Sequence, residues 1–289
     1  MSSDNTLEKV KKLREITGVG FKDCKNAIDE TKGDINKSIE YLRKKGIAKA
    51  NKKMERVAAD GLVSISENNN NFSIIEINSE TDFVAKNNDF INFVEEISEI
   101  SLSKRSDLKN ILSTKMKNGI SVDESLIALI SKIGEKITIR RSDFFTSENC
   151  LNFSYTHSEI KNNLGKIGTL VSIKTQKKIE ELAEFGKQLT MHVAALAPMA
   201  IDKDGLQNDI LAKEKEIITD ELKNSGKDEK IIDKIAIGKL NKFINDNTLL
   251  NQEWIIDPKK KVKDILKEIS GNDKIEIIKF VRFKVGEGV

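Results

Sequence analysis

"GLVSISENNNNFSIIEINSE", residues 61–80, contains two runs in which the side chains alternate between two faces. The alternating sets are Leu62, Ser64 and Ser66 against Val63 and Ile65, then Phe72, Ile74 and Glu76 against Ile75 and Ile77. A period of two is typical of β-strands, and the asparagines at 68–71 favour a turn between the runs. The stretch therefore predicts a β-hairpin.

Helices and a further strand are predicted after this hairpin. Apolar residues then recur at the spacing of one helix face, namely Phe90, Phe93, Val94, Ile97 and Ile100. A second amphipathic helix is predicted over 121–132, and "EKITIRRSDFF" (135–145) returns as a strand.

The same order of elements recurs in the second half of the chain. Residues 150–175 read as another hairpin with "NNLGK" (162–166) as its turn, 180–198 as a helix and 274–288 as a strand. We therefore predict an α+β fold whose core consists of two related α+β subdomains, 59–143 and 144–289.

An inserted helical hairpin is predicted at about 206–250. Two narrow apolar stripes, one of them including Ile210, Leu211, Ile217, Ile218 and Leu222, flank a polar turn, "KNSGKDE" (223–229). Two such helices joined by a short loop are typical of an antiparallel coiled coil. We expect this hairpin to project from the second subdomain.

The first 46 residues predict a module of three short helices. "TGVGF" (17–21) breaks the first helix, Asp34 is the expected N-cap of the third, and Gly46 its expected end. So small a unit is marginal alone, which favours a docking role. Residues 47–58 are expected to be a basic linker, either a solvated tether or a nucleic-acid patch.

Composition narrows the function. The chain has 289 residues and a net charge of +3, a balance that argues against a general nucleic-acid binder. Its two cysteines fit a reducing compartment, and neither a secretory signal nor a long apolar span is evident, so we expect a soluble, cytoplasmic protein. Phosphate-loop, dinucleotide and nucleophile-elbow motifs are absent from the sequence. We expect a protein that acts by contact, without catalytic residues, metal or cofactor.

Phe83 has two possible roles. Phe83, Phe90 and Ile97 are seven residues apart, so a single helix from 81 onward would bury all three. However, "KNND" (86–89) offers poor helix formers and good caps, so the helix can restart there and leave Phe83 on a preceding turn. Spacing alone favours the buried position.

The motifs of the chain resemble the bacterial elongation factor Ts family over essentially its whole length. They include "ETDFVAKN" (80–87), "KIGEKITIRR" (132–141), "SYTH" (154–157), "MHVAALAP" (191–198) and "FVRFKVGEG" (280–288). The resemblance implies a ubiquitin-associated-like (UBA-like) N-terminal module of three helices, a core of two related subdomains and a protruding coiled coil.

The resemblance also implies a guanine nucleotide exchange factor that acts on elongation factor Tu in its GDP-bound and nucleotide-free forms. The partner-binding segment that dislodges magnesium and GDP would be Thr81, Asp82, Phe83 and Val84. Further partner contacts would come from Arg14, Phe21, Lys25, Ile133, Gly134 and His157. Lys22 departs from relatives, many of which carry an apolar residue there. A homodimer and a heterotetramer with the partner both stay open.

Three rival interpretations follow from the same residues. A non-catalytic adaptor would use the three-helix module to bind other proteins and the core as a scaffold. A metal-dependent hydrolase would need ligands among the scattered acids. RNA binding would use the lysines of 46–58 and "DPKKKVK" (257–263).

Overall fold

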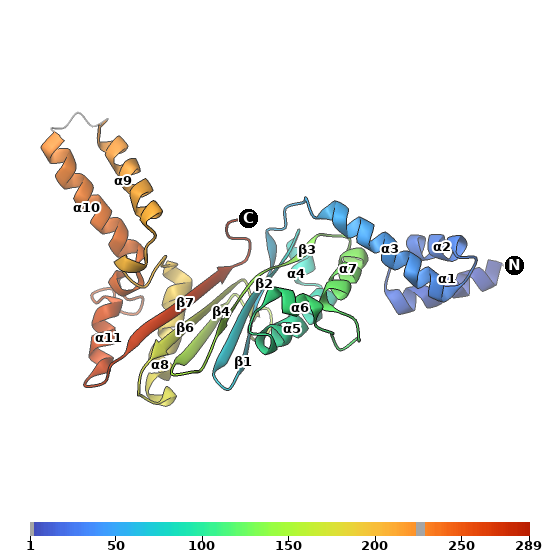
Figure 1. Ribbon diagram of the computed structural model, residues 1–289, viewed down its shortest axis with the longest axis horizontal. Helices are drawn as coiled ribbons and strands as arrows, with labels where there is room; N and C mark the ends of the chain where they lie inside the picture. Colours follow the sequence, from blue (N-terminus) through green and yellow to red (C-terminus); the bar gives the residue numbers. More distant parts are fainter. Residues whose placement is uncertain (1–2, 224–228) are drawn as a thin grey trace.

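A computed structural model describes residues 3–223 and 229–289 (Figure 1). The helices are α1 (Ser3–Thr17), α2 (Phe21–Glu30), α3 (Ile35–Lys53), α4 (Asp82–Ala85), α5 (Asn88–Ser103), α6 (Leu108–Ser113), α7 (Val122–Ile133), α8 (Ile179–Leu196), α9 (Asn208–Lys223), α10 (Glu229–Asn247) and α11 (Val262–Ser270). The strands are β1 (Asp60–Asn68), β2 (Asn71–Ser79), β3 (Ile137–Phe145), β4 (Leu151–His157), β5 (Leu164–Gly165), β6 (Ile167–Lys174) and β7 (Glu276–Lys284). The mixture of helix and sheet confirms the predicted α+β class.

Two antiparallel sheets form the centre of the molecule. The first has the order β3-β2-β1-β5 and the second the order β4-β6-β7. In both, a hairpin comes first and a later strand pairs with the hairpin's second strand. The pairing between β2 and β3 shifts register at Glu76/Ile77, and the pairing between β6 and β7 shifts register at Ser172/Ile173. The two sheets thus share connectivity and the place of an irregularity.

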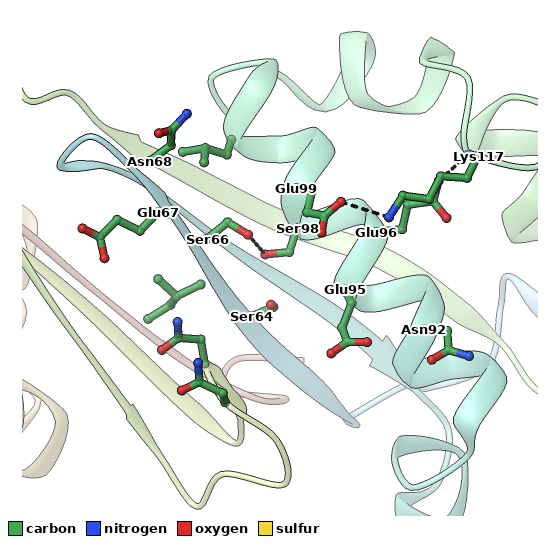
Figure 2. Close-up of a pocket in the computed structure, with 14 residues that line it drawn as sticks. Ser64, Ser66, Glu67, Asn68, Asn92, Glu95, Glu96, Ser98, Glu99 and Lys117 are labelled. Atoms are coloured by element: carbon green, nitrogen blue, oxygen red, sulfur yellow. Dashed lines mark hydrogen bonds and ion pairs between the residues drawn. The ribbon is translucent and has the colours of Figure 1, made fainter.

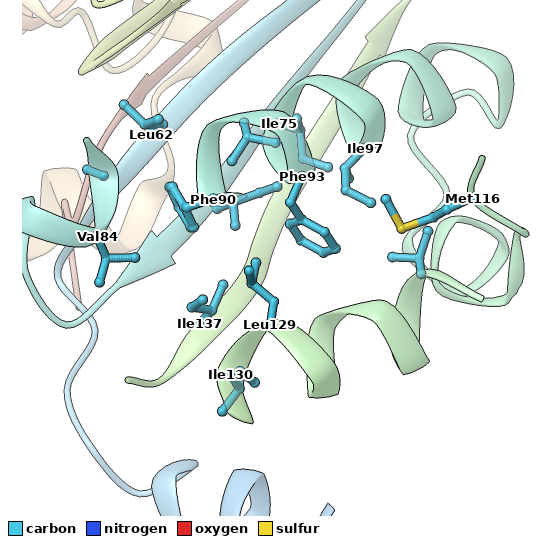
Figure 3. Close-up of a cluster of buried hydrophobic side chains, with 14 of the residues drawn as sticks. Leu62, Ile75, Val84, Phe90, Phe93, Ile97, Met116, Leu129, Ile130 and Ile137 are labelled. Atoms are coloured by element: carbon cyan, nitrogen blue, oxygen red, sulfur yellow. The ribbon is translucent and has the colours of Figure 1, made fainter. Parts of the chain in front are cut away.

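The sheets pack face to face, and helices cover their outer faces. On β1, Leu62 joins a cluster with α5 and α7, whereas Val63 and Ile65 join a cluster with Leu170 of β6 and Phe283 of β7. Figure 3 shows the first cluster, in which Phe90, Phe93 and Ile97 of α5 face Leu129 and Ile130 of α7. A third cluster joins β6 to α8 and α11. The two faces of β1 therefore contribute to two different cores, and β1, β2 and β6 are buried on both faces along most of their length.

The N-terminal helices α1, α2 and α3 enclose a small core of their own. Its buried members are Val10, Leu13, Cys24, Ala27, Ile28 and Leu42. Asp34 caps α3 as predicted, since its side chain accepts a hydrogen bond from the Lys37 N–H at 3.1 Å.

The predicted end of the third helix at Gly46 is wrong. Helix α3 continues to Lys53, so the predicted boundary falls inside a helix and much of the expected linker is helical. A Cβ at position 46 would lie 2.6 Å from Ser131 Oγ of α7. Gly46 therefore permits the close approach of α3 to α7, and does not end the helix.

Helices α9 and α10 lie side by side and project away from the sheets (Figure 1). Lys239 Nζ pairs with Glu221 at 2.8 Å, and Leu211 packs with Leu240 and Ile244 near the base. Ile218 and Leu222 are buried, but Ile217 of the predicted stripe is 53% exposed, so that assignment is wrong. The predicted turn at 223–229 falls mostly outside the described residues. Within the described ranges, every helix is too short or too polar to span a membrane.

Candidate functional site: an exposed aromatic turn

Phe83 lies on α4, a single helical turn between β2 and α5. The next two residues, Val84 and Ala85, are buried in the first core, whereas Phe83 is 79% exposed. Figure 3 shows Val84 on this short helix at the edge of the buried cluster. The turn is therefore anchored by its second half and displays its aromatic ring to solvent.

The helix restart expected from "KNND" explains this exposure. Asn87 adopts an extended backbone and its side chain accepts hydrogen bonds from Asp89 N at 2.8 Å and Phe90 N at 3.4 Å. This cap starts α5 as a new helix, so the seven-residue spacing from Phe83 to Phe90 does not run along one helix face. The buried interpretation of Phe83 is wrong, and the exposed one is confirmed.

Two carboxylates tie the Phe83 turn to the turn after α7. Glu135 accepts from Thr81 N at 3.0 Å and from Thr81 Oγ1 at 2.9 Å. In return, Glu80 accepts from Lys136 N at 2.6 Å. Each turn thus supplies the acid that binds the backbone N–H of the other. Charge-assisted bonds of this type are among the stronger hydrogen bonds in proteins.

Charges around the ring are paired. Asp82 and Lys86 form an ion pair at 2.7 Å, whose hydrogen bond lowers the pKa of Asp82 and raises that of Lys86. Burial by itself would raise the pKa of Glu80, but hydrogen bonds from Lys136 N and the Arg56 guanidinium hold it below its ordinary value. These carboxylates therefore stay ionised at neutral pH, next to an apolar ring.

Ile133 and Gly134 lie at the end of α7, next to this turn, and His157 lies at the end of β4. Gly134 ends α7 in the left-handed conformation, with φ of 87°, directly before the Glu135 that binds Thr81. His157 is exposed at the end of β4, its Nδ1 lies 2.9 Å from the Tyr155 hydroxyl, and its carbonyl accepts from Lys166 N at 3.1 Å. The Lys166 charge in turn lowers the pKa of Asp82. The structure thus places Gly134 directly beside the Phe83 turn, whereas His157 lies on the second sheet and is connected to this region only through Lys166.

Arg14, Phe21 and Lys25 lie on the N-terminal module. All three are exposed, Phe21 by 45%. The module's first turn nevertheless reaches the core, because a Cβ on Gly18 would lie 2.9 Å from Lys132 Cε, and Lys132 pairs with Asp89 of α5 at 2.8 Å. These three residues form a second group, and the contact of their module with Lys132 of α7 connects it to the helix that precedes Glu135.

Sequence reasoning missed the residues that brace the turn. Glu80, Glu135 and Lys136 flank their turns like any polar loop residues, and Arg56 lies in the stretch expected to be a linker. Their partners are between 24 and 82 positions away, so no short motif could reveal them.

A basic hollow lies between α3 and α7, where the linker was expected. Lys49, Lys52, Lys53 and Arg56 line it, with a volume of about 310 Å³. Lys49 pairs with Asp23 at 2.7 Å, Arg56 with Glu80 at 3.2 Å, and Lys53 donates to the Gly134 carbonyl at the end of α7. These cations therefore neutralise acids or cap a helix C-terminus, which is favourable there.

A second hollow, of about 800 Å³, is lined by acids of α5 and by β1 (Figure 2). The three glutamates that α5 contributes are already engaged: Glu95 with Lys161 at 2.6 Å, Glu96 with Lys117 N at 2.5 Å and Glu99 with Lys117 Nζ at 3.3 Å. Over residues 3–223 and 229–289, no group of three or more His, Cys, Asp and Glu side chains is placed to hold a metal ion.

The fold and the site together define a modular α+β protein that displays a braced aromatic turn between helical appendages. Comparison with known proteins gives its family. The family model described as Elongation factor TS matches residues 80–287. Elongation factor Ts of Xanthobacter autotrophicus is 41% identical over 283 residues, which cover 97% of this chain and 92% of the relative. That of Nitrobacter hamburgensis is 39% identical over 286 residues, covering 98% and 93%. The chain belongs to the elongation factor Ts family, which confirms the resemblance of its motifs.

Proposed function

We propose that this protein is a guanine nucleotide exchange factor that binds elongation factor Tu with GDP and promotes GDP release, so that GTP can bind. The observation that carries the proposal is Phe83, which is 79% exposed although its neighbours Val84 and Ala85 are buried. A large apolar ring held in water on an anchored turn is suited to insertion into a partner.

The proposed mechanism is mechanical and needs no cofactor of this protein's own. Thr81 to Val84 press on the partner's nucleotide domain, Phe83 enters between its side chains, and Asp82 lies beside the magnesium site. The ion's coordination and the phosphate loop are disturbed, and GDP leaves. Burying a Phe side chain contributes ~1.5–3 kcal/mol, similar to the ~1–3 kcal/mol of typical coupling between sites. Because coupling is reciprocal, GDP must weaken the binding of this protein by the same factor.

The remaining predicted residues are proposed as secondary contacts of the same partner. Ile133, Gly134 and His157 would extend the surface around Phe83. Arg14, Phe21 and Lys25 would hold the nucleotide domain from the N-terminal module.

The predicted architecture beyond the α+β class belongs to the same proposal. The three N-terminal helices would be a UBA-like docking module, joined to the core by the second half of α3 and the residues up to 58. Residues 59–143 and 144–289 would be two related subdomains. The α9–α10 pair would be a coiled-coil insertion, and the protein would work in the cytoplasm. The shared connectivity of the two sheets supports the relationship between the subdomains.

Release of a fluorescent GDP from the cognate elongation factor Tu, followed by stopped flow, tests the proposal. The wild-type protein should accelerate release, and Phe83→Ala should slow it by about 10- to 100-fold, the equivalent of ~1.5–3 kcal/mol. Ile120→Ala is the matched control, since Ile120 is 40% exposed but precedes α7 at the end opposite Gly134.

The outcomes separate the rival interpretations. An adaptor would bind without accelerating GDP release. An unchanged rate for Phe83→Ala would contradict the role given to the ring, even if the wild-type protein is active.

A further inference from the structure

We infer that Glu135 is a positioning residue for nucleotide exchange, and that it acts by fixing the turn that presents Phe83. The inference rests on the proposed function and deepens it. Glu135 touches neither the ring nor, in the proposed complex, the nucleotide. Its carboxylate instead holds the residue from which α4 starts.

The Phe83 turn needs support from outside because it is so short. Helix α4 has only 4 residues, and an isolated helical turn is unstable in water. Its N-cap residue, Thr81, makes no side-chain hydrogen bond to α4 itself. The Thr81 hydroxyl is directed instead to Glu135, which also binds the Thr81 N–H. The start of the turn is therefore fixed by α7's exit turn, and its end by the buried Val84 and Ala85.

The hydrogen bonds between the two turns are reciprocal and extend to the segment that follows α3. Glu80 binds Lys136 N at 2.6 Å and the Arg56 guanidinium at 3.2 Å. Lys136 Nζ donates to the carbonyls of Met54 and Arg56, at 2.7 and 2.8 Å. The end of α3, the Phe83 turn and the end of α7 are thus joined by hydrogen bonds on both sides of Glu135.

Insertion of Phe83 into the partner requires a rigid turn. If the turn yields when Phe83 meets the partner, the free energy of inserting the ring deforms this protein and not the nucleotide site. Fixing a loop in its bound conformation also removes the ordering cost of binding. Loss of Glu135 should therefore reduce the maximal rate of exchange more than the affinity for the partner.

The test uses the full-length protein in four forms beside wild type: Glu135→Ala, Glu135→Gln, Phe83→Ala and the Phe83→Ala/Glu135→Ala double variant. Fluorescent GDP release is measured at increasing concentrations of each form, which separates maximal rate from half-saturation. We expect Glu135→Ala to lower the maximal rate about tenfold, equivalent to ~1.4 kcal/mol. Glu135→Gln should keep most of the rate, because its amide oxygen can still accept from the Thr81 N–H.

The double variant distinguishes positioning from general stability. If Glu135 acts through Phe83, removing it should slow exchange no further once the ring is absent. Full additivity of the two losses, a wild-type rate for Glu135→Ala, or equal loss in Glu135→Gln would each overturn the inference.

Two further measurements keep the test decisive. Hydrogen exchange of the free protein should show faster exchange of the amides of 81–86 in Glu135→Ala, and unchanged protection there would overturn the inference. If Glu135→Ala does not fold, Thr81→Val tests the same contact, because it removes only the hydroxyl that donates to Glu135. This variant should give a smaller loss of maximal rate, and no loss would contradict the role of the Glu135–Thr81 hydrogen bonds. A normal rate for Phe83→Ala would instead contradict the role of the ring, and a wild-type protein that does not accelerate GDP release would contradict the proposed function itself.

Discussion

At the scale of single residues, neighbours in the chain have opposite roles. Phe83 is exposed and Val84 is buried, although both are large and apolar. Hydrophobicity alone cannot tell them apart, because apolar residues occur on surfaces as well as in cores. The Asn87 cap decides the difference, since it ends the influence of α5's apolar face before position 83 is reached.

His192 is a second residue whose surroundings decide its chemistry. Its Nδ1 accepts from Ile255 N at 3.3 Å, and its Nε2 lies 3.0 Å from Gln252 Oε1. The Gln252 amide nitrogen donates to the carbonyls of Leu196 and Asp246, which leaves Oε1 as the acceptor. His192 is therefore neutral and protonated on Nε2, and it stacks on Trp254 at 5.3 Å.

This environment predicts a loss of stability in mild acid. Burial lowers the pKa of His192 below its ordinary 6.5, so the unfolded chain takes up the proton more readily than the folded one. The contribution of His192 to the free energy of unfolding should be constant above pH 6.5. Below pH 6.5 it should decrease, by at most ~1.4 kcal/mol per pH unit. Urea unfolding at pH values from about 7.5 down to about 5.5 measures how steeply the free energy of unfolding depends on pH. His192→Gln should flatten it, and an equal slope in that variant would assign the effect elsewhere.

At the scale of elements, α3 shows how packing replaces a local signal. Glycine is a poor helix former, and it usually follows a helix end. At Gly46, however, the helix continues. A glycine is needed at this position because α7 leaves no room for a side chain. Ala50, one turn further on, is 4% exposed and belongs to the first core. The second half of α3 is thus part of the core, and its first half is part of the N-terminal module.

Two glycines in helices allow a matched test of this packing. Gly238 of α10 has open space where a Cβ would lie, whereas Gly46 faces Ser131 Oγ at 2.6 Å. Gly238→Ala should raise the free energy of unfolding by ~0.5–1 kcal/mol, and Gly46→Ala should lower it by ~1 kcal/mol or more. Denaturant unfolding of both variants measures the difference. A gain in Gly46→Ala equal to that in Gly238→Ala would show that α3 does not press on α7.

At the scale of the whole molecule, a buried carboxylate joins the C-terminal strand to the first sheet. Glu76 of β2 is fully buried and accepts from Arg140 at 3.0 Å, Arg141 at 2.5 Å and Gly286 N at 2.9 Å. Burial by itself would raise the pKa of Glu76, but the bonds from Gly286, Asn78 and Arg141 hold it below its ordinary value. Gly286 is required beside it, because a Cβ there would lie 2.0 Å from the Ala59 carbonyl.

Breaking this contact should destabilise the entire fold. Glu76→Ala leaves Arg140 and Arg141 without their shared partner and should cost ~3–5 kcal/mol in the free energy of unfolding. Glu76→Gln, which keeps the shape and an acceptor oxygen, should cost less. Urea unfolding compares the two. Equal losses in both variants would mean that shape, and not the ion pairs, determines the contribution of Glu76.

The N-terminal module should be separable from the core. The buried residues of its hydrophobic cluster come from α1, α2 and α3, and Ala50 of the first core would remain after a cut at 46. Removal of residues 1–46 should weaken partner binding by ~1–3 kcal/mol while the melting temperature of the core changes by only a few degrees. Titration with elongation factor Tu and thermal melting measure the two effects. A large fall in melting temperature would contradict this separation.

The sequence alone predicted the order and type of most elements, but not α6, α11 or the short strand β5. Alternation over 61–80, the helix stripe from Phe90 and the Asp34 cap are local patterns, and each element formed where predicted. The motifs were equally sufficient for the family. Local patterns suffice here because propensity, capping and periodicity act within one or two turns of chain.

Only the tertiary structure decided what depends on contacts between distant segments. Gly46 lies against Ser131, Ile217 faces solvent, and Glu135 reaches Thr81 across 54 positions. The neighbouring residues in the chain do not indicate these contacts. Each contact contributes to the free energy of folding only after α7 and the sheets have packed. The sequence by itself thus determined most of the elements and the family, because both depend on local patterns, whereas packing decided how Phe83 is held.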